Sequence, residues 1–383
     1  MAVGIICEYN PFHLGHEKQL RMIRAQLGSD TPIVCLMSGS FVQRGAPAIF
    51  DSTLRAQAAV TCGASLVLEL PTAYTLRSAE GFARGGVEIL SRLGVVEQLC
   101  FGCESGDGAA IRRAAEALCR TGYDEQLRAL LAQGLSYPAA RQRALAALDG
   151  EDALLREPND ILAVEYCKAI LQQQSPLCPM AIRRGGAYHS GAPESENPSA
   201  TAVRAAFPDG AWRMCVPAAV QTLYQDAAVH TLAAGERAML ARLRALREDE
   251  WQCVPYGGEG LWSKVRRAVQ TQPSVEAVID ASISRRYPRT RLNRLLLCAY
   301  LGLSDALLAQ QASYVRVLAF DAAGQRLLRQ IHENAPDYLL NAGARAPTRA
   351  AQELEQRLDG LYALFSEKDT AVRGKKRVFQ KKT

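Results

Sequence analysis

The stretch AVGIICEYNPFHLGH, residues 2–16, joins a short apolar run to a polar segment that holds two of the chain's five histidines. The apolar run, 2–7, is typical of a fully buried strand. A helix is expected to start just after it, so that His13 and His16 lie at the helix start, and Gly15 leaves room for a ligand close to the backbone. In an open parallel sheet, ligands bind beyond the carboxyl ends of the strands. The sequence therefore predicts a binding site at this point.

Apolar runs alternate with segments of helical periodicity through the N-terminal half of the chain. The runs typical of buried strands cover residues 2–7, 32–37, 65–70, 96–102 and 178–184. Helical periodicity covers residues 16–28, 51–62, 78–93, most of 108–174, and 199–207. Strand–helix alternation predicts a parallel sheet covered on both faces. The predicted fold class is therefore α/β, with a Rossmann-like parallel-sheet domain over residues 1–207.

The rest of the chain has a different character. Longer helical patterns with many arginines cover 232–249 and 288–303, and residues 313–333 are typical of a strand and a helix inserted among the other helices. The last ten residues hold five basic side chains and no acidic one. We expect a mainly helical, basic C-terminal domain over residues 208–383.

The composition excludes several classes of protein. With 383 residues, of which 48% are hydrophobic and 22% charged, the chain is globular rather than disordered. No apolar stretch has membrane-spanning length, and the first residues predict no secretion signal. The eleven cysteines, an odd number, lie mostly in apolar runs and are expected to be buried thiols in a reducing cytosol. Cys100 and Cys103 have CxxC spacing, but without a second pair or a nearby histidine no metal site is predicted.

The two histidines stand where phosphate binds most readily. Backbone N–H groups and the dipole at a helix start attract phosphate, and imidazoles there can follow the charge that develops on a leaving pyrophosphate. The alternative is that His13 and His16 only cap the helix and fill a loop. A second segment, SATAVR at 199–204, brings hydroxyls and a guanidinium to another helix start. These groups can bind phosphate, although the first serine could instead be an ordinary N-cap. These groups belong to Ser199, Thr201 and Arg204.

Both segments resemble known motifs. GIICEYNPFHLGH, residues 4–16, resembles the HxGH signature of the nucleotidyltransferase superfamily, whose members attack the α-phosphate of a nucleotide and release pyrophosphate. SATAVR is similar to the superfamily's later Ser/Thr-rich motif that ends in arginine. A closer resemblance, to the tRNA(Met) cytidine acetate ligase family, rests on SGSFVQRGAPAIFD (38–51), FGCE (101–104), PNDILAVEY (158–166), IRRGGAYHS (182–190) and TRLNRLLL (290–297). The chain departs from that family at Cys7, where an aliphatic residue is usual, and at Cys103, where a serine of similar size is usual.

The resemblance implies an ATP-dependent acetate ligase. Such an enzyme forms acetyl-adenylate from acetate and ATP, with Mg²⁺, and passes the acetyl group to the wobble cytidine of elongator tRNA(Met), which becomes N4-acetylcytidine. It makes residues 1–207 a nucleotidyltransferase domain and His13 and His16 the catalytic residues. The expected location is the cytoplasm, and no membrane partner is expected.

The same resemblance places ATP along the first motif, with contacts from later strands and helices. The implied nucleotide-binding residues are Cys7, Glu8, Tyr9, Asn10, Pro11, Phe12, His13, Leu14, Gly15, His16, Glu17, Lys18, Gln19, Leu20, Gly102, Asn159, Arg183, Arg184, Ser199, Thr201 and Arg204. Because Gly102 has no side chain, adenine or ribose could lie on its backbone. The Asn159 amide could bind adenine or cap its helix, and the Arg183–Arg184 pair either faces the triphosphate or is solvated.

Two further features are expected near the edge of the sheet where ligands bind. The loop with Ser38, Gly39, Ser40, Gln43 and Arg44 is polar and suits either acetate or the incoming cytidine. Glu8 is given no proton-transfer role, because a carboxylate beside a triphosphate is repelled unless a divalent cation lies between them.

Basic residues cluster in the C-terminal part rather than spreading evenly. SRRYPRTRLNR, residues 284–294, holds five arginines, and its Tyr287 could stack on an unpaired base. Together with the tail it predicts tRNA contacts at Arg285, Arg286, Arg289, Arg291, Arg294, Lys375, Lys376 and Arg377. The alternative is that these arginines form ordinary solvated helix faces.

Two other functions agree with parts of the sequence. A small-metabolite adenylyltransferase, acting on a mononucleotide or pantetheine-like substrate, would usually end soon after the second motif, whereas roughly 180 residues follow it here. A non-catalytic RNA-binding protein would be expected to lose an imidazole or Arg204, and all three groups are present. Pyrophosphate release separates an enzyme from a binding protein, and dependence on acetate and tRNA separates the two enzymes.

Overall fold

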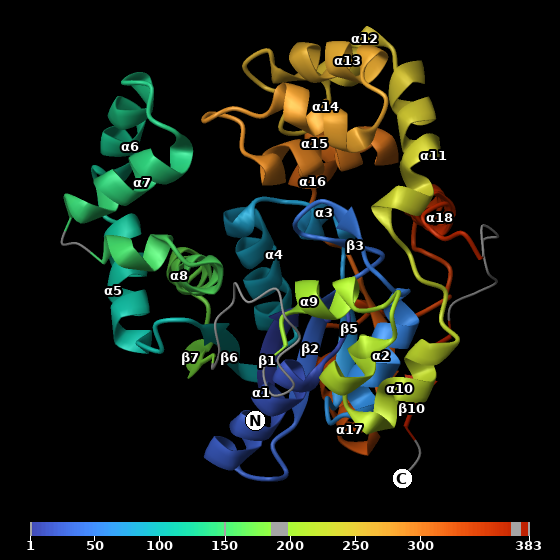
Figure 1. Ribbon diagram of the computed structural model, residues 1–383. Coiled ribbons are helices and arrows are strands. Elements are labelled where there is room, and N and C mark those ends of the chain that lie inside the picture. Colours follow the sequence, from blue (N-terminus) through green and yellow to red (C-terminus); the bar gives the residue numbers. More distant parts are fainter. Residues whose placement is uncertain (1, 149–150, 185–197, 369–376, 382–383) are drawn as a thin grey trace.

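A parallel sheet lies at the centre of the molecule (Figure 1). The computed structural model describes residues 2–148, 151–184, 198–368 and 377–381. Five parallel strands form the middle of the sheet in the order β5-β2-β1-β6-β7. They are β1 (Ala2–Cys7), β2 (Ile33–Ser38), β5 (Leu66–Leu70), β6 (Val96–Cys103) and β7 (Cys178–Arg183). The strand order reverses between β1 and β6, and this reversal is where Rossmann-like sheets bind nucleotides. The predicted fold class is confirmed.

The burial of the first strand explains why the run at 2–7 carries no charged or amide side chain. Every residue of β1 is buried, because successive side chains point to opposite faces and both faces are covered. Ala2 and Ile6 belong to the apolar core on one face, and Val3, Ile5 and Cys7 to the core on the other. A turn with polar side chains can follow only where the strand leaves both cores, at its carboxyl end.

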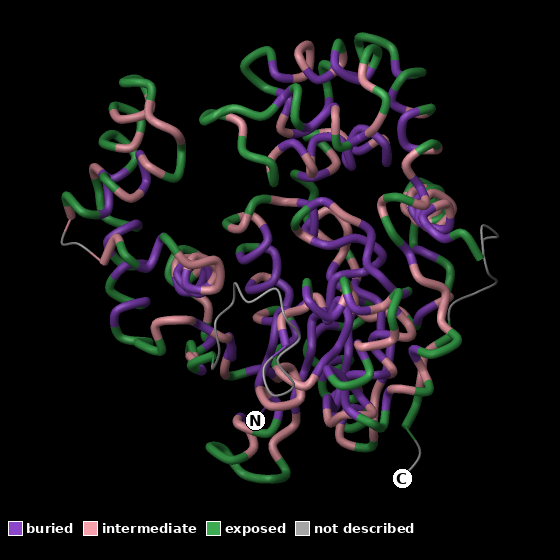
Figure 2. The backbone as a smooth tube through the Cα atoms, viewed as in Figure 1, coloured by how far each residue is buried: buried purple, intermediate pink, exposed green. Residues whose placement is uncertain are grey.

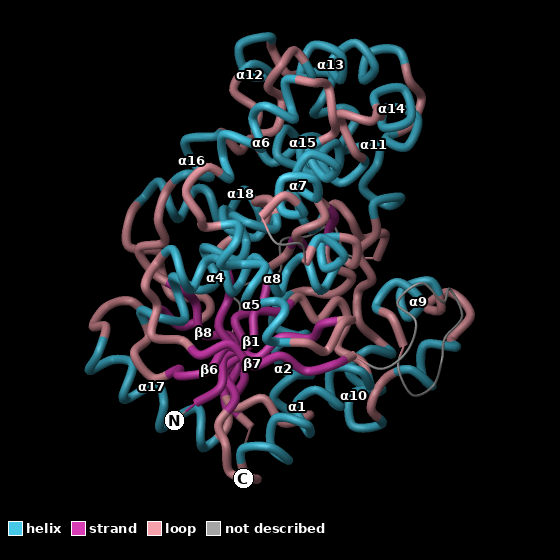
Figure 3. Tube along the Cα trace, turned by 90° about the vertical axis from the view of Figure 1, so that its left-hand side faces the viewer, coloured by secondary structure: helices cyan, strands magenta, loops and turns pink. Residues whose placement is uncertain are grey.

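Helices cover the two faces of the sheet (Figure 3). One face packs against α1 (Leu14–Leu27), α2 (Ser52–Thr61) and α10 (Ala218–Gln225). The other packs against α4 (Ala79–Arg92), α5 (Gly108–Leu118) and α8 (Pro158–Gln172). Beyond α5, the helices α6 (Tyr123–Ala132) and α7 (Tyr137–Ala146) form an arm at the left of Figure 1. Short 3-10 turns cover Asp152–Leu155 and Ala211–Cys215.

A helical bundle with its own apolar core follows in the chain. It contains α11 (Leu232–Ala245), α12 (Glu248–Gln252), α13 (Leu261–Thr271), α14 (Val275–Ser282), α15 (Arg289–Leu301) and α16 (Asp305–Ala309). In Figure 1 it stands above α3 (Thr72–Thr75) and a small hairpin formed by β3 (Phe41–Val42) and β4 (Ala46–Pro47). Figure 2 shows buried segments concentrated in the sheet and in the middle of the bundle. Among the described helices, none combines the length and apolar character needed to span a membrane.

The strand predicted at 313–320 is present, but its predicted place as an insertion among helices is wrong. It is β8 (Val315–Phe320), which pairs antiparallel with β5 in the central sheet. β9 (Leu339–Asn341) and β10 (Phe379–Gln380) then pair with β8, and α17 (Ala322–Asn334) and α18 (Arg349–Ala363) complete this part. The pairing covers the edge of β5, whose N–H and C=O groups would otherwise lack partners. The sheet thus takes strands from both sides of residue 207, and the division into domains 1–207 and 208–383 stays a prediction.

Candidate active site

The two histidines of the first motif lie at the start of α1, directly beyond β1. His13 is the N-cap: its Nδ1 accepts a hydrogen bond of 3.1 Å from the Gly15 N–H. His16 completes the cap, since its Nδ1 accepts the His13 N–H over 3.3 Å. The rings stack with their centroids 3.7 Å apart. Because each Nδ1 is an acceptor, each neutral ring carries its proton on Nε2, where it can be donated to a ligand.

Both imidazoles are held in the neutral form. Burial lowers the pKa of His13 from 6.5 to about 3, and the charges of Arg184 and Arg204 act in the same direction. Burial also lowers the pKa of His16 well below its usual value, with His13 and Arg184 adding to the effect. The positive charge of the site therefore comes from the arginines and the α1 N-terminus, while the histidines supply neutral N–H donors.

The second motif lies against the first. In α9 (Ala200–Ala205), Arg204 donates from Nη1 to the Asn10 carbonyl over 2.7 Å and from Nη2 to Thr201 Oγ1 over 3.1 Å. The Pro198 carbonyl oxygen lies 3.8 Å from the position that a Cβ on Gly15 would take. The structure therefore brings the two motifs together, although about 180 residues separate them in the chain.

Ser199 is an N-cap, which was the alternative to phosphate binding that the sequence left open. Its hydroxyl accepts the Ala202 N–H over 3.1 Å and so caps α9. The capping bond uses one acceptor of the hydroxyl, which keeps its own O–H as a donor.

The segments FGCE and PNDILAVEY also meet, where β6 ends and α8 begins. Glu104 Oε2 accepts the Asp160 N–H over 2.9 Å, and Asp160 Oδ1 accepts the Glu104 N–H over 2.9 Å. Asn159 donates from Nδ2 to Glu104, and its Oδ1 lies 3.5 Å from Arg184 Nη1. Asn159 thus links the loop after β6 to an arginine that influences both histidines.

The paired arginines at the end of β7 lie against different glycines. A Cβ on Gly102 would be 3.0 Å from Arg184 Cγ, and a Cβ on Gly106 would be 2.8 Å from Arg183 Cδ. Arg184 is the member of the pair that lowers the pKa of both histidines. Its aliphatic part fills the space over Gly102 in this structure, so a nucleotide could lie on that backbone only after Arg184 moves.

Several residues of the implied nucleotide-binding stretch pack inside the protein. Tyr9, Phe12 and Leu20 are each no more than 1% exposed. Burial and the neighbouring Cys35 raise the pKa of the Cys7 thiol well above its usual value, which favours the protonated, less reactive form. The positions on the first turns of α1 are half-buried instead, namely Leu14, Gly15, His16, Glu17, Lys18 and Gln19. Of these, Gln19 donates to Cys100 Sγ over 3.8 Å.

Arg55 on α2 is an element of the site that sequence reasoning missed. The residue is fully buried, and its guanidinium donates to the carbonyl oxygens of Glu8 over 2.5 Å, Phe50 over 2.9 Å and Ser38 over 3.0 Å, as well as to that of Gly39. These carbonyls belong to the segments after β1, after β2 and before α2. Arg55 therefore holds together the loops at the carboxyl edge of the sheet. Arg55 is the one basic residue of the expected helix at 51–62, but this alone does not indicate its role.

Glu8 and the hairpin loop are joined by a backbone hydrogen bond. Glu8 Oε1 accepts the Gln43 N–H over 2.7 Å, and Gln43 Nε2 donates to the Arg77 carbonyl over 3.3 Å. The Glu8 carboxylate is thus engaged in holding the hairpin, which agrees with giving it no proton-transfer role.

Comparison with known proteins identifies the family that shares these motifs. The model of the HIGH Nucleotidyl Transferase family matches residues 1–377. A tRNA(Met) cytidine acetate ligase of Clostridium perfringens is 33% identical and covers 95% of this chain and 95% of its own. Another, of Syntrophomonas wolfei, is 37% identical and covers 86% of this chain and 84% of its own. The chain belongs to the tRNA(Met) cytidine acetate ligase family.

Solved structures agree with the fold of this family. The ligand-free TmcAL of Thermotoga maritima has a TM-score of 0.88 at 25% identity, with both chains covered completely. The same protein bound with alpha-thio ATP has a TM-score of 0.87. The sheet and the helical bundle therefore share their arrangement with an acetate ligase relative that has been seen with an ATP analogue.

The five arginines of 284–294, whose clustering made them candidates for tRNA contact, form two groups. Arg285, Arg286 and Arg289 lie at or just before the start of α15 and are exposed. Arg286 Nη2 is 2.6 Å from Glu259 Oε1, and Arg289 pairs with Glu276. Exposed pairs of this kind are weak, so RNA phosphates could replace the carboxylates.

The second group faces the protein. Arg291 Nε donates to the Tyr256 carbonyl over 3.1 Å, and the Arg294 guanidinium lies 5.0 Å from the centroid of the Tyr256 ring. Burial lowers the pKa of Arg294. Both residues help to pack α15 and are less suited to RNA than the exposed three. Of the predicted tail contacts, Arg377 is exposed, and Lys375 and Lys376 lie outside the described residues.

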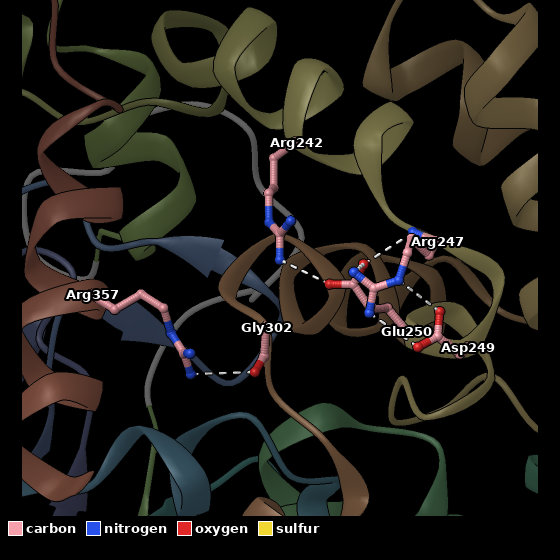
Figure 4. A network of polar contacts seen from close by, with 6 residues as sticks. All are labelled: Arg242, Arg247, Asp249, Glu250, Gly302 and Arg357. Atoms are coloured by element: carbon pink, nitrogen blue, oxygen red, sulfur yellow. Dashed lines mark hydrogen bonds and ion pairs between the residues drawn. The ribbon is translucent and has the colours of Figure 1, made fainter.

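Other arginines, in the bundle and in α18, contact neighbouring residues. Figure 4 shows these contacts for Arg242, Arg247, Asp249, Glu250, Gly302 and Arg357. Arg242 Nη2 lies 3.4 Å from Glu250 Oε1, and Arg357 donates to the Gly302 carbonyl, where α15 ends, over 3.3 Å. These three arginines were not predicted to contact tRNA, and they form ion pairs or a hydrogen bond to a backbone carbonyl.

Proposed function

We propose that this protein activates acetate with ATP and transfers the acetyl group to the wobble cytidine of elongator tRNA(Met). In the first step an acetate oxygen attacks the α-phosphorus of ATP, and pyrophosphate leaves. In the second the N4 amine of cytidine attacks the acetyl carbonyl carbon, and AMP leaves as the amine loses a proton. The observation that carries the proposal is the stacked pair of neutral imidazoles at the start of α1, with the charges of Arg184 and Arg204 acting on the site.

This arrangement suits a reaction in which negative charge moves onto pyrophosphate. The guanidiniums and the α1 N-terminus attract the triphosphate before reaction. The Nε2–H groups of His13 and His16 can strengthen their hydrogen bonds as the leaving group gains charge. Since the rings are neutral, they need no proton from solvent to act as donors.

We infer that Mg²⁺ enters with ATP rather than occupying a separate protein site. Among the described residues, no group of three or more His, Cys, Asp or Glu side chains is arranged to hold a metal ion. The Glu8 carboxylate, directly beyond β1, already accepts the Gln43 N–H. Phosphate oxygens and water would then supply most of the ligands of the ion, as is common for Mg²⁺.

The identity of the acceptor rests on the relatives and on the bundle. The curated relatives are named for tRNA(Met), and exposed arginines lie at the start of α15. The eleven cysteines are all free thiols, which supports a cytoplasmic location, where tRNA is also found.

Acetate-dependent exchange of pyrophosphate into ATP tests the first step without RNA. The proposal predicts exchange that requires acetate. A small-metabolite adenylyltransferase would instead form ATP from pyrophosphate and its adenylylated product, without acetate. Exchange that is indifferent to acetate would contradict the proposed function.

A further inference from the structure

The β3–β4 hairpin contacts two parts of the molecule whose relative position matters for the proposed function. On one side, the Gln43 N–H donates to Glu8, directly beyond β1. On the other side, Gly45 lies on the backbone of α15: a Cβ built on Gly45 would be 2.6 Å from the Arg294 nitrogen and 2.6 Å from the Asn293 carbonyl carbon. We call the segment between β1 and α1, residues 8–13, the catalytic turn. The hairpin therefore spans the distance from the catalytic turn to the helix with the candidate tRNA-binding arginines.

The contact between the hairpin and α15 allows little adjustment. Gly45 has a φ of +78°, in the left-handed region that favours glycine. The atoms that it meets are backbone atoms of a helix, so no side chain can rotate away to make room. A glycine here is required both by the turn and by the closeness of the helix.

Other contacts dock the bundle independently of the hairpin tip. Tyr256 Oη donates to the Leu76 carbonyl over 2.7 Å, and Arg77 donates to the Gln310 carbonyl over 3.1 Å. Phe41 and Leu76 also contribute to the apolar core of the bundle. A change at the tip should therefore shift α15 locally and leave the bundle attached.

We propose that the β3–β4 hairpin is a positioning element for acetyl transfer, with Gly45 setting the distance between α15 and the catalytic turn. The inference rests on the proposed function, because it assumes that RNA binds at the start of α15. Transfer requires the cytidine amine within about 3–3.5 Å of the acetyl carbon, and a misplacement of about 1 Å can cost on the order of 10²-fold in rate. We take the polar loop at 38–44 to serve the cytidine rather than the acetate. Adenylate formation then uses only small molecules bound beyond β1 and does not depend on α15.

The test compares the two half-reactions in Gly45→Ala. For an ordinary contact of about 3.5 Å, the new methyl group requires hairpin and helix to separate by about 1 Å. We expect kcat/KM for tRNA acetylation to fall roughly 10- to 100-fold, whereas acetate-dependent pyrophosphate exchange keeps its wild-type rate. The matched control is Gly260→Ala, since Gly260 has a φ of +75° and no atom within 4 Å of its would-be Cβ. That variant carries the same backbone strain without the contact, and both of its rates should match wild type.

Two results in Gly45→Ala would overturn the inference: acetylation as fast as in wild type, or an equal loss of exchange and acetylation. If Gly45→Ala does not fold, a one-glycine insertion between Arg44 and Gly45 serves instead. It moves the tip without adding a side chain, and the same split between the half-reactions is expected. A wild-type protein that exchanges pyrophosphate but acetylates no RNA would refute the proposed function itself, a result distinct from any obtained with the variants.

Discussion

At the scale of single residues, the site depends on two histidines. In each, one ring nitrogen caps the helix and the other is available to a ligand. Their Nδ1 atoms complete the N-cap of α1, which leaves Nε2–H for the ligand. Burial keeps both rings neutral, and Arg184 and Arg204 supply the positive charge. A plain alanine substitution would therefore remove a helix cap as well as a donor, at a cost of about 1 kcal/mol in stability.

Replacements that retain the caps separate these two roles. Asparagine is a good N-cap, and glutamine at the third helical position can accept the N-cap N–H. We expect His13→Asn and His16→Gln each to lower acetate-dependent pyrophosphate exchange by on the order of 10²-fold, the usual effect of losing one transition-state donor, with little change in thermal stability. His332→Asn, on the exposed face of α17, serves as a control with no expected effect. Near-normal exchange in both variants would show that the histidines only cap the helix.

The lowered pKa of His13 also predicts how stability depends on pH. As pH falls below 6.5, the unfolded chain binds a proton at this residue, whereas the folded chain does not until about pH 3. Stability is therefore lost on acidification through this window, by on the order of 2 kcal/mol per such histidine between pH 6.5 and 5. Denaturant unfolding at pH 7 and pH 5 should show a smaller loss in His13→Asn than in wild type. Equal losses would mean that His13 takes up a proton in the folded protein.

At the scale of elements, sequence patterns predicted the parallel strands to within about one residue. The patterns are clearest in β1, β2 and β5, which are almost entirely buried, whereas β7 at the end of the sheet is largely exposed. The position of β8 in the sheet could not be predicted in this way. The apolar run predicted a strand, but its partner, β5, lies some 250 residues earlier in the chain and is chosen by packing that no local pattern records. The prediction of an insertion failed for that reason.

The candidate site shows the same limit. His13, His16 and Arg204 could be predicted because they belong to motifs with recognisable spacing. Arg55 could not, since its role comes from three loops that converge on one buried guanidinium. The separation of the 284–294 arginines into exposed and packed members likewise depends on how α15 is rotated, which the cluster itself does not specify.

The basic segment before α15 is expected to act as an electrostatic contact for RNA. Replacing Arg285 and Arg286 with alanine should weaken tRNA binding and flatten its salt dependence, since each phosphate contact adds about 0.7–0.9 to the slope of log K against log salt concentration. Binding can be measured across a salt series, with pyrophosphate exchange as a check that the ATP site is intact. The control is Arg247→Ala, whose side chain is 71% exposed and paired with Asp249. An unchanged affinity and slope in the double variant would mean that this segment is only a solvated face.

At the scale of the whole molecule, residues from both ends of the chain build the framework that holds the two half-reactions together. The central sheet takes strands from β1 to β10, the nucleotide motifs meet at its carboxyl edge, and the bundle is docked above that edge (Figure 1). Tyr362 of α18 adds a further tie, donating to the Ala48 carbonyl over 2.8 Å. One chain can thus bring an adenylate and an RNA acceptor to the same place.

The most direct test of this account is nucleoside mass analysis of elongator tRNA(Met) after incubation with the purified protein, ATP and acetate. We expect N4-acetylcytidine at the wobble position, formed only when both ATP and acetate are present, and formed on the order of 10²-fold more slowly when the protein carries His13→Asn. Unmodified cytidine after incubation with active wild-type protein, or acetylation that proceeds without ATP, would contradict it.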